Sequence, residues 1–223
     1  MRVVILQPPA WLWETPGNSL AQALAVPHIS FGDLVRAHVR QRTELGIRFM
    51  ESMNSGELPP DELLAATVRD HLRREAPAGF LIDHHPLNTT QARALDELLH
   101  ELSSPLDAVV HLHLPEQEVE RHVRRQASRR VCSNDTAHPC EPAADHLAAE
   151  RVCNVCGGDL YQRQDDQEST VRDRFSRHEA MVEPITRHYA EQELLVTVDA
   201  VGTPEEIAGR ALTALRQHNR GHR

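Results

Sequence analysis

The sequence predicts an α/β fold of three layers, built on a five-stranded parallel sheet. Five short apolar runs, which predict strands, alternate with helical patterns typical of the connections between parallel strands. We expect strands at 2–6, 27–30, 79–83, 107–114 and 193–198, and helices at 61–75, 89–102, 116–126, 168–190 and 204–216. Two further segments, 30–59 and 127–164, interrupt this alternation, and we interpret them as two small subdomains inserted into one core.

The segment after the first strand is unusual for a strand–loop–helix start. In nucleotide-binding proteins of this shape, a GxxxxGK[ST] loop holds phosphates with its backbone N–H groups and its lysine. Here the place is taken by Gln7-Pro8-Pro9-Ala10-Trp11-Leu12-Trp13-Glu14-Thr15, and all 24 cationic residues of the chain are arginines. We therefore expect ordinary phosphate-loop chemistry to be missing. Because Pro16-Gly17 breaks a first helical turn, the next helix is expected to start at Asn18 or Ser19.

Trp11 and Trp13 are the only tryptophans of the chain, and both fall in this altered loop. Their rings are candidates for stacking on a base or for capping a new substrate. Alternatively, they fill the space that a nucleotide would otherwise occupy and restore packing there. The sequence leaves both interpretations open.

The length, apolar content and net charge of the chain limit the kinds of partner it is expected to bind. A chain of 223 residues can bury one substantial core, and it contains no apolar run long enough to span a membrane and no signal peptide, so we expect a cytoplasmic protein without a membrane partner. The net charge of −9 argues against a nucleic-acid partner. We expect a monomer.

Histidines follow two of the predicted strands. His84 and His85 come directly after the strand at 79–83, and open α/β sheets place their sites at the carboxyl ends of strands. A histidine there could act as a general acid or base, or the pair could lie in a solvated loop. His111 and His113 alternate along one face of another strand, where we expect core histidines, with ligand binding as the alternative.

The segment 127–164 contains all four cysteines. Clustered cysteines in a cytosolic protein indicate a metal site rather than disulfides. Cys153-Asn154-Val155-Cys156-Gly157-Gly158 is a zinc-knuckle pattern, and Cys132 is a third ligand. The fourth ligand is His138 or Cys140. We predict a structural zinc ion that holds together a segment too small for its own apolar core.

Several motifs together carry a family resemblance. They lie along a match that runs from Met1 to about residue 215, and they are the segments Ile29–Arg36, Thr43–Gly46, Gly56–Glu62, Gly79–Asp83, Pro105–Val109, Arg129–Cys132 and Val152–Asp166. With them the chain resembles the adenylate kinase family, specifically its bacterial form with a zinc-bearing lid. The resemblance implies a fold of the P-loop NTPase type. It also implies phosphoryl transfer from Mg-ATP to a nucleoside monophosphate, with magnesium as a further candidate cofactor.

The resemblance also implies a division of the chain. A core domain is expected at 1–29, 60–124 and 165–223, a nucleoside monophosphate (NMP)-binding insert at 30–59, and a zinc lid at 125–164. By the Cys-x5-His spacing of lids in this family, His138 is the preferred fourth zinc ligand.

Residue by residue, the resemblance is incomplete. It implies nucleotide-binding roles for Gly32, Arg36, Met53, Gln91, Arg125 and Arg172, and catalytic roles for Asp83, Arg129, Arg163 and Arg174, to which we add His84. Asp83 corresponds to the carboxylate that orients magnesium. Phe31 and Leu87 stand where the family has a threonine and a second phosphate-binding arginine.

These observations predict an adenylate kinase-like protein with a degenerate phosphate-binding (Walker A) loop. We expect it to bind a nucleotide or another phosphate-bearing small molecule, with ordinary kinase activity very low and the site turned to a different reaction. The alternatives are a non-catalytic protein that binds a nucleotide or a partner, and a weakly active nucleoside monophosphate kinase.

Overall fold

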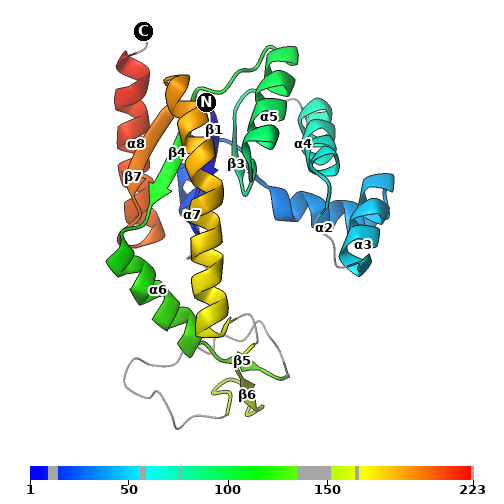
Figure 1. Cartoon of the computed structure of the whole chain (residues 1–223), viewed down its shortest axis with the longest axis vertical. Helices are drawn as coiled ribbons and strands as arrows, with labels where there is room; N and C mark the ends of the chain where they lie inside the picture. The colour runs from blue at the N-terminus through cyan, green and yellow to red at the C-terminus, as the bar shows by residue number, and fades with distance from the viewer. Residues whose placement is uncertain (10–14, 56–58, 76, 135–151, 164–165, 222–223) are drawn as a thin grey trace. The chain divides into compact units, whose positions relative to one another are not determined.

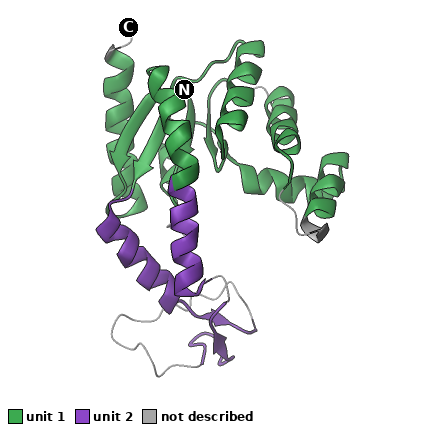
Figure 2. Ribbon diagram, in the orientation of Figure 1, with its two compact units in different colours: residues 1–113, 180–223 green, residues 114–179 purple. Residues whose placement is uncertain are grey.

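The computed structural model describes residues 1–9, 15–55, 59–75, 77–134, 152–163 and 166–221 (Figure 1). The chain divides into two compact units (Figure 2). The first, the sheet unit, comprises Met1–His113 and Ala180–Arg223. The second, the cysteine unit, comprises Leu114–Glu179. The predicted lid of 125–164 falls inside the cysteine unit, and its boundaries stay a prediction.

The sheet unit contains the predicted five-stranded parallel sheet. Its strands are β1 (Arg2–Leu6), β2 (His28–Ser30), β3 (Phe80–Asp83), β4 (Ala108–His113) and β7 (Leu195–Asp199), in the order β2-β3-β1-β4-β7. Val4 in β1 pairs with Ile82 of β3 on one side and with Val109 of β4 on the other. Strands that are covered by helices on both faces are apolar along their length, which is why the sequence shows runs rather than alternation. The fold class is therefore confirmed.

The helices follow the predicted pattern closely. They are α1 (Pro16–Leu24), α2 (Phe31–Gln41), α3 (Glu44–Ser55), α4 (Asp61–Glu75), α5 (Thr89–Glu101), α6 (Glu116–Ser128), α7 (Glu168–Glu191) and α8 (Pro204–Gly221). Among the described residues, no helix is both long enough and apolar enough to cross a membrane.

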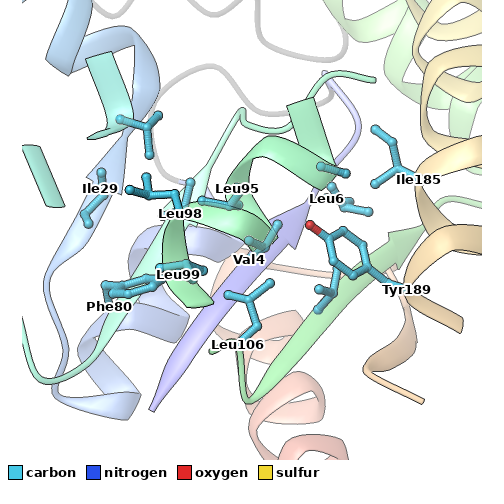
Figure 3. Packing of buried hydrophobic residues seen from close by; sticks show 14 of the residues in the cluster. Val4, Leu6, Ile29, Phe80, Leu95, Leu98, Leu99, Leu106, Ile185 and Tyr189 are labelled. Atoms are coloured by element: carbon cyan, nitrogen blue, oxygen red, sulfur yellow. The ribbon is translucent and has the colours of Figure 1, made fainter. Parts of the chain in front are cut away.

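Helices cover both faces of the sheet. On one face, α4, α5 and the last part of α7 enclose a core to which Val4, Leu95 and Tyr189 contribute (Figure 3). On the other face, α1 packs against α8, α1 also contacts β2 and β3, and α8 contacts β7. These two layers leave the carboxyl ends of β1, β2 and β3 side by side at one edge.

The start of α1 corrects one expectation. The helix begins at Pro16, not at Asn18 or Ser19. Thr15 is its N-cap, and the Thr15 hydroxyl accepts a hydrogen bond from the Asn18 backbone N–H at 3.3 Å. Proline is favoured at the first helical position, because the N–H that it lacks would have no partner within the helix. The pair Pro16-Gly17 therefore opens the helix instead of breaking it.

Two smaller pieces complete the chain. Within the sheet unit, α2 and α3 lie between β2 and α4, and Phe49 packs with Leu63 and Leu64 in a separate small core. The cysteine unit contains α6, the first part of α7, and the short antiparallel strands β5 (Val131–Cys132) and β6 (Leu160–Tyr161).

Candidate functional site

A buried carboxylate lies at the carboxyl edge of the sheet. Asp83, the last residue of β3, is 2% exposed. Gln7, which follows β1, donates a hydrogen bond from Nε2 to Asp83 Oδ2 at 2.8 Å. His28 Nε2, from β2, lies 3.4 Å from the same oxygen, and His84 Nδ1 lies 2.5 Å from Oδ1. Three neighbouring strands therefore bring an amide and two imidazoles to one carboxylate.

The electrostatics of this cluster favour a charged pair. Burial disfavours the ionised form of Asp83, but the adjacent imidazoles of His28 and His84 outweigh burial and lower the pKa of the carboxyl group. The adjacent Asp83 carboxylate in turn raises the pKa of His84, against the opposing effects of burial and of the Arg36 charge. Asp83 is therefore an anion over the physiological range, and His84 gains imidazolium character beside it.

The first turn of α1 also lies against this carboxylate. A methyl group on Gly17 would sit 3.5 Å from Asp83 Oδ2 and 3.4 Å from His28 Nε2. The amino-terminal end of a helix carries partial positive charge, so α1 adds to the stabilisation of the buried anion.

The predicted residues of the NMP side are partly described. Arg36 is exposed, and its Nη2 forms an ion pair with Asp33 Oδ1 at 2.7 Å. The Arg36 guanidinium lies over Gly32, where a Cβ atom would meet Nη1 at 3.1 Å. The side chain of Met53 and both Trp11 and Trp13 lie outside the described part of the chain.

Gln91 is buried with both ends of its amide in use. Its Oε1 accepts from the Leu87 N–H at 2.7 Å, and its Nε2 donates to Asp61 Oδ1 at 2.7 Å. In this conformation Gln91 fixes the segment after β3 to α4. To contact a nucleotide base, as the resemblance implied, Gln91 would have to break its hydrogen bond with Leu87 or with Asp61 and form one with the base.

An aromatic pair stands where the sequence departs from the family. The Phe31 ring stacks on the buried His85 ring, with centroids 5.5 Å apart and an interplanar angle of 20°. Burial lowers the pKa of His85 to about 4, against the smaller opposing effect of Asp61, so the ring is neutral at pH 7. The Leu87 side chain is 39% exposed. This part of the chain is consequently more apolar than the resemblance implied.

For His111 and His113, the structure agrees with the sequence-based expectation only in part. His111 is half-buried, and burial lowers its pKa to about 4, with a smaller effect from His113. His113 is exposed, so the expectation of two core histidines was wrong for it. His113 is the last residue of β4, and it is exposed although it still pairs with Asp199 of β7.

The five predicted arginines of the lid fall in the cysteine unit. Arg172 pairs with Glu120, where Nη2 is 2.8 Å from Oε2, and with Glu168. Arg129 Nη1 lies 3.7 Å from Asp166 Oδ2. Arg125 and Arg163 are exposed, and Arg174 is half-buried. Their roles toward a ligand stay predictions.

Three cysteines of this unit form a candidate metal centre. The Sγ atoms of Cys132, Cys153 and Cys156 all lie within 4.8 Å of one another. Cys132 Sγ and Cys156 Sγ are 3.4 Å apart, which is too long for a disulfide and close to the spacing of about 3.8 Å expected for thiolates on one tetrahedral zinc ion.

The backbone around this centre has the turn that a knuckle requires. The Gly157 N–H donates to the Cys153 carbonyl at 2.8 Å, and Gly157 has a φ of 74°, which favours glycine. The donor set therefore fits zinc. Both His138 and Cys140 lie outside the described residues, so the choice between them stays a prediction.

Sequence reasoning missed Gln7 and His28 as members of the Asp83 cluster. Gln7 follows the last residue of β1, and His28 is the first residue of the three-residue strand β2; both strands border β3 in the sheet. The strand order carries that information, and it was not predicted. The signal that was available is that the polar residues nearest the ends of three predicted parallel strands are candidates for one site.

Comparisons with known proteins agree with the geometry. A family model described as adenylate kinase matches residues 5–194. The chain is 44% identical to an adenylate kinase of Streptomyces avermitilis over 98% of this chain and 99% of the relative. It is 45% identical to one of Streptomyces coelicolor over 97% and 99%, and 39% identical to one of Acidothermus cellulolyticus over 99% and 100%.

Proposed function

Because the chain belongs to the adenylate kinase family, we propose that it binds nucleotides and transfers a phosphoryl group from ATP to a nucleoside monophosphate slowly. The observation that carries the proposal is the identity of 44–45% to two relatives named adenylate kinase, over nearly the whole of each chain. The activity is proposed to be slow because residues 7–15 do not contain the lysine and glycines of a phosphate-binding loop.

The size of the expected loss follows from the chemistry. Phosphoryl transfer depends on positioning and on the neutralisation of charge, with little covalent work for the protein. Removal of a single preorganised donor typically slows an enzyme by about 10²–10³. Since a degenerate loop loses a cation and several N–H donors together, we expect a rate at least about 10³ below that of an ordinary relative.

Within the sheet unit, two groups are proposed to act on the nucleotides. Arg36 would bind the phosphate of the acceptor, since its side chain is 62% exposed and its only hydrogen-bond partner among the described residues is the exposed Asp33. Asp83 would orient the reacting phosphates by the charge that the sheet edge holds in place. Both Asp83 oxygens already face nitrogen donors, so magnesium is proposed to arrive as part of Mg-ATP, as substrate.

Within the cysteine unit, we propose that the arginines attract phosphate groups and that the cysteines bind a stabilising metal ion. Arg125, Arg129, Arg163, Arg172 and Arg174 supply positive charge suited to phosphate oxygens. Cys132, Cys153 and Cys156, with His138, would hold a zinc ion. Zinc bound by thiolates is redox-inert and structural, and it would fix the unit that carries the arginines.

A second candidate is a different reaction on a phosphate-bearing ligand. One observation favours it: the buried Asp83 is flanked by two imidazoles, a donor set suited to proton transfer. In that case, Mg-ATP and AMP would bind without forming ADP. Binding without turnover of any nucleotide tested would instead favour a non-catalytic protein.

The test is product analysis after incubation with Mg-ATP and AMP, separating the three adenine nucleotides by chromatography. The adenylate kinase of Streptomyces coelicolor serves as the reference, and Asp83→Asn, purified identically, reports contamination by a host kinase. We expect ADP from the wild type at a rate at least about 10³ below the reference, and none from Asp83→Asn. Equal ADP from wild type and variant would reject the kinase proposal.

A further inference from the structure

We propose that His84 is a phosphate-binding residue, and that its Nε2–H and the Arg36 guanidinium together form an anion site at the carboxyl end of β3. The inference rests on the proposed nucleotide binding and adds a residue to it. It identifies which group of this lysine-free chain takes over part of the charge that a phosphate-loop lysine would supply.

The backbone at His84 is the first observation. His84 has a φ of 59°, in the left-handed region that glycine adopts without cost. A residue with a Cβ atom costs roughly 1–2 kcal/mol there. Residues held in such conformations cluster at ligand-binding sites, where the surrounding structure fixes them. A histidine at this position is therefore a reason to look for a role of its side chain.

The orientation of the ring is the second observation. Nδ1 is the nitrogen that faces Asp83 Oδ1, so Nε2 is the nitrogen left for solvent or a ligand. The side chain is 56% exposed although the carboxylate behind it is buried. Among the residues that the structure describes, no side chain forms a hydrogen bond with Nε2. The buried Asp83 thus fixes a ring whose outer N–H points away from the protein interior.

The surrounding charges are the third observation. Arg36, on α2, lies in the same region of the sheet unit as His84, since its guanidinium lies over Gly32 and the neighbouring Phe31 ring stacks on His85. His84 and Arg36 each have their own carboxylate, since Asp83 pairs with His84 and Asp33 with Arg36. His28 also faces Asp83. A dianionic phosphate between the two cations would relieve their repulsion while competing with the exposed Asp33.

Calorimetric titration with AMP at pH 7 and pH 9 tests the site. The phosphate is mostly a dianion at both values, whereas the imidazolium of His84 loses its proton as the pH rises. We expect wild-type affinity for AMP to fall about tenfold between the two, as for the loss of one hydrogen bond to a charged group. Affinity for adenosine, which has no phosphate, should stay unchanged.

Three variants separate binding from folding. His84→Gln keeps a donor without the charge, and we expect about tenfold weaker AMP binding at pH 7 and no further loss at pH 9. His84→Gly suits the positive φ, which offsets part of the stability lost with the imidazole beside Asp83, so the variant should stay folded while it loses the same affinity. His100→Gln, an exposed histidine on α5, should behave as the wild type.

The outcomes distinguish this inference from the proposed function. If His84→Gln and His84→Gly bind AMP as tightly as the wild type at both pH values, the His84 site is rejected and nucleotide binding stands. If the wild type binds no nucleotide, the same variants are titrated with inorganic pyrophosphate. Loss of pyrophosphate affinity in His84→Gln then supports the anion site alone, and unchanged or absent binding rejects it as well.

Discussion

The sheet unit and the cysteine unit are stabilised in different ways. The sheet unit buries apolar side chains from five strands and from helices on both faces, among them Val4, Ile82 and Leu95. In its described residues the cysteine unit has two strands of two residues each, and few apolar side chains are buried beside its two buried cysteines: Leu114, Val123, Val131, Val171 and Phe175. A small piece with so little apolar burial depends on another source of stability, and a metal ion held by thiolates is one.

Because of this difference, a single substitution should disturb the functional residues of one unit more easily than those of the other. Asp83 and His84 stand at the end of a strand in the apolar core, so their geometry depends on many dispersed contacts. The arginines of the cysteine unit are placed by a few ion pairs, such as Arg172 with Glu120, and by the proposed zinc ion. Loss of one zinc ligand should therefore displace the arginines of the cysteine unit and leave Asp83 and His84 in place.

The largest expected effect is the loss of zinc. Cys153→Ser removes one of three thiolates, and structural zinc contributes about 10 kcal/mol or more to the folding of small zinc domains. We expect the wild type to carry about one zinc ion per chain and the variant almost none. Metal analysis measures the ion, and limited proteolysis with mass spectrometry should find new cleavage only within 114–179.

Two kinds of control accompany this experiment. Ser176→Ala, an exposed change on α7 within the cysteine unit, should retain zinc and resist the protease. His138→Ala and Cys140→Ser, made separately, test the fourth ligand, and we expect zinc loss only in the first. Retention of zinc by Cys153→Ser would contradict the inference that the cysteine unit, unlike the sheet unit, depends on a metal ion for its stability.

The next effect is on the core of the sheet unit. Leu95 is 2% exposed on α5, and Leu95→Ala should lower the free energy of unfolding by about 2–5 kcal/mol, since it removes buried methyl groups and leaves a cavity. Urea unfolding measures this loss, and zinc content should not change. Arg93→Ala, exposed on the same helix, should cost less than about 0.5 kcal/mol. A zinc loss in Leu95→Ala would show that the two units do not fold separately.

The fold was largely predictable because its signals are local. The central strand β1 is an apolar run, and α4 spans Asp61–Glu75, as the apolar face and the preceding prolines predicted. The start of α1 was missed since two principles compete there. Pro16-Gly17 weakens a helix interior, but proline is favoured at a first turn, and the Thr15 cap decided the outcome.

The candidate site was less predictable because it depends on strand order. Asp83 was identified from the family resemblance and His84 from its place at a strand end, whereas Gln7 and His28 join them only because β2, β3 and β1 are adjacent. The stacking of Phe31 on His85 is a contact between residues distant in sequence, and no local pattern predicts it. The cysteine centre was predictable because spacing alone brings CxxC ligands together.

The smallest expected effect is a pH dependence confined to the sheet unit. His85 has a pKa of about 4 when folded and 6.5 as a reference, so the unfolded chain binds more protons between these values. The free energy of unfolding should therefore fall by up to about 3 kcal/mol as the pH drops from 6.5 to 4.

The variant His85→Phe tests this dependence. Phenylalanine keeps an aromatic ring against Phe31 without the titrating group, so the free energy of unfolding, measured with urea, should change less with pH across that window. His111, whose pKa is lowered in the same direction, should leave a residual slope, and the exposed His100→Gln should retain the wild-type slope. A wild-type slope in His85→Phe would show that His85 is not the source of the acid sensitivity and would leave it to other groups, such as His111.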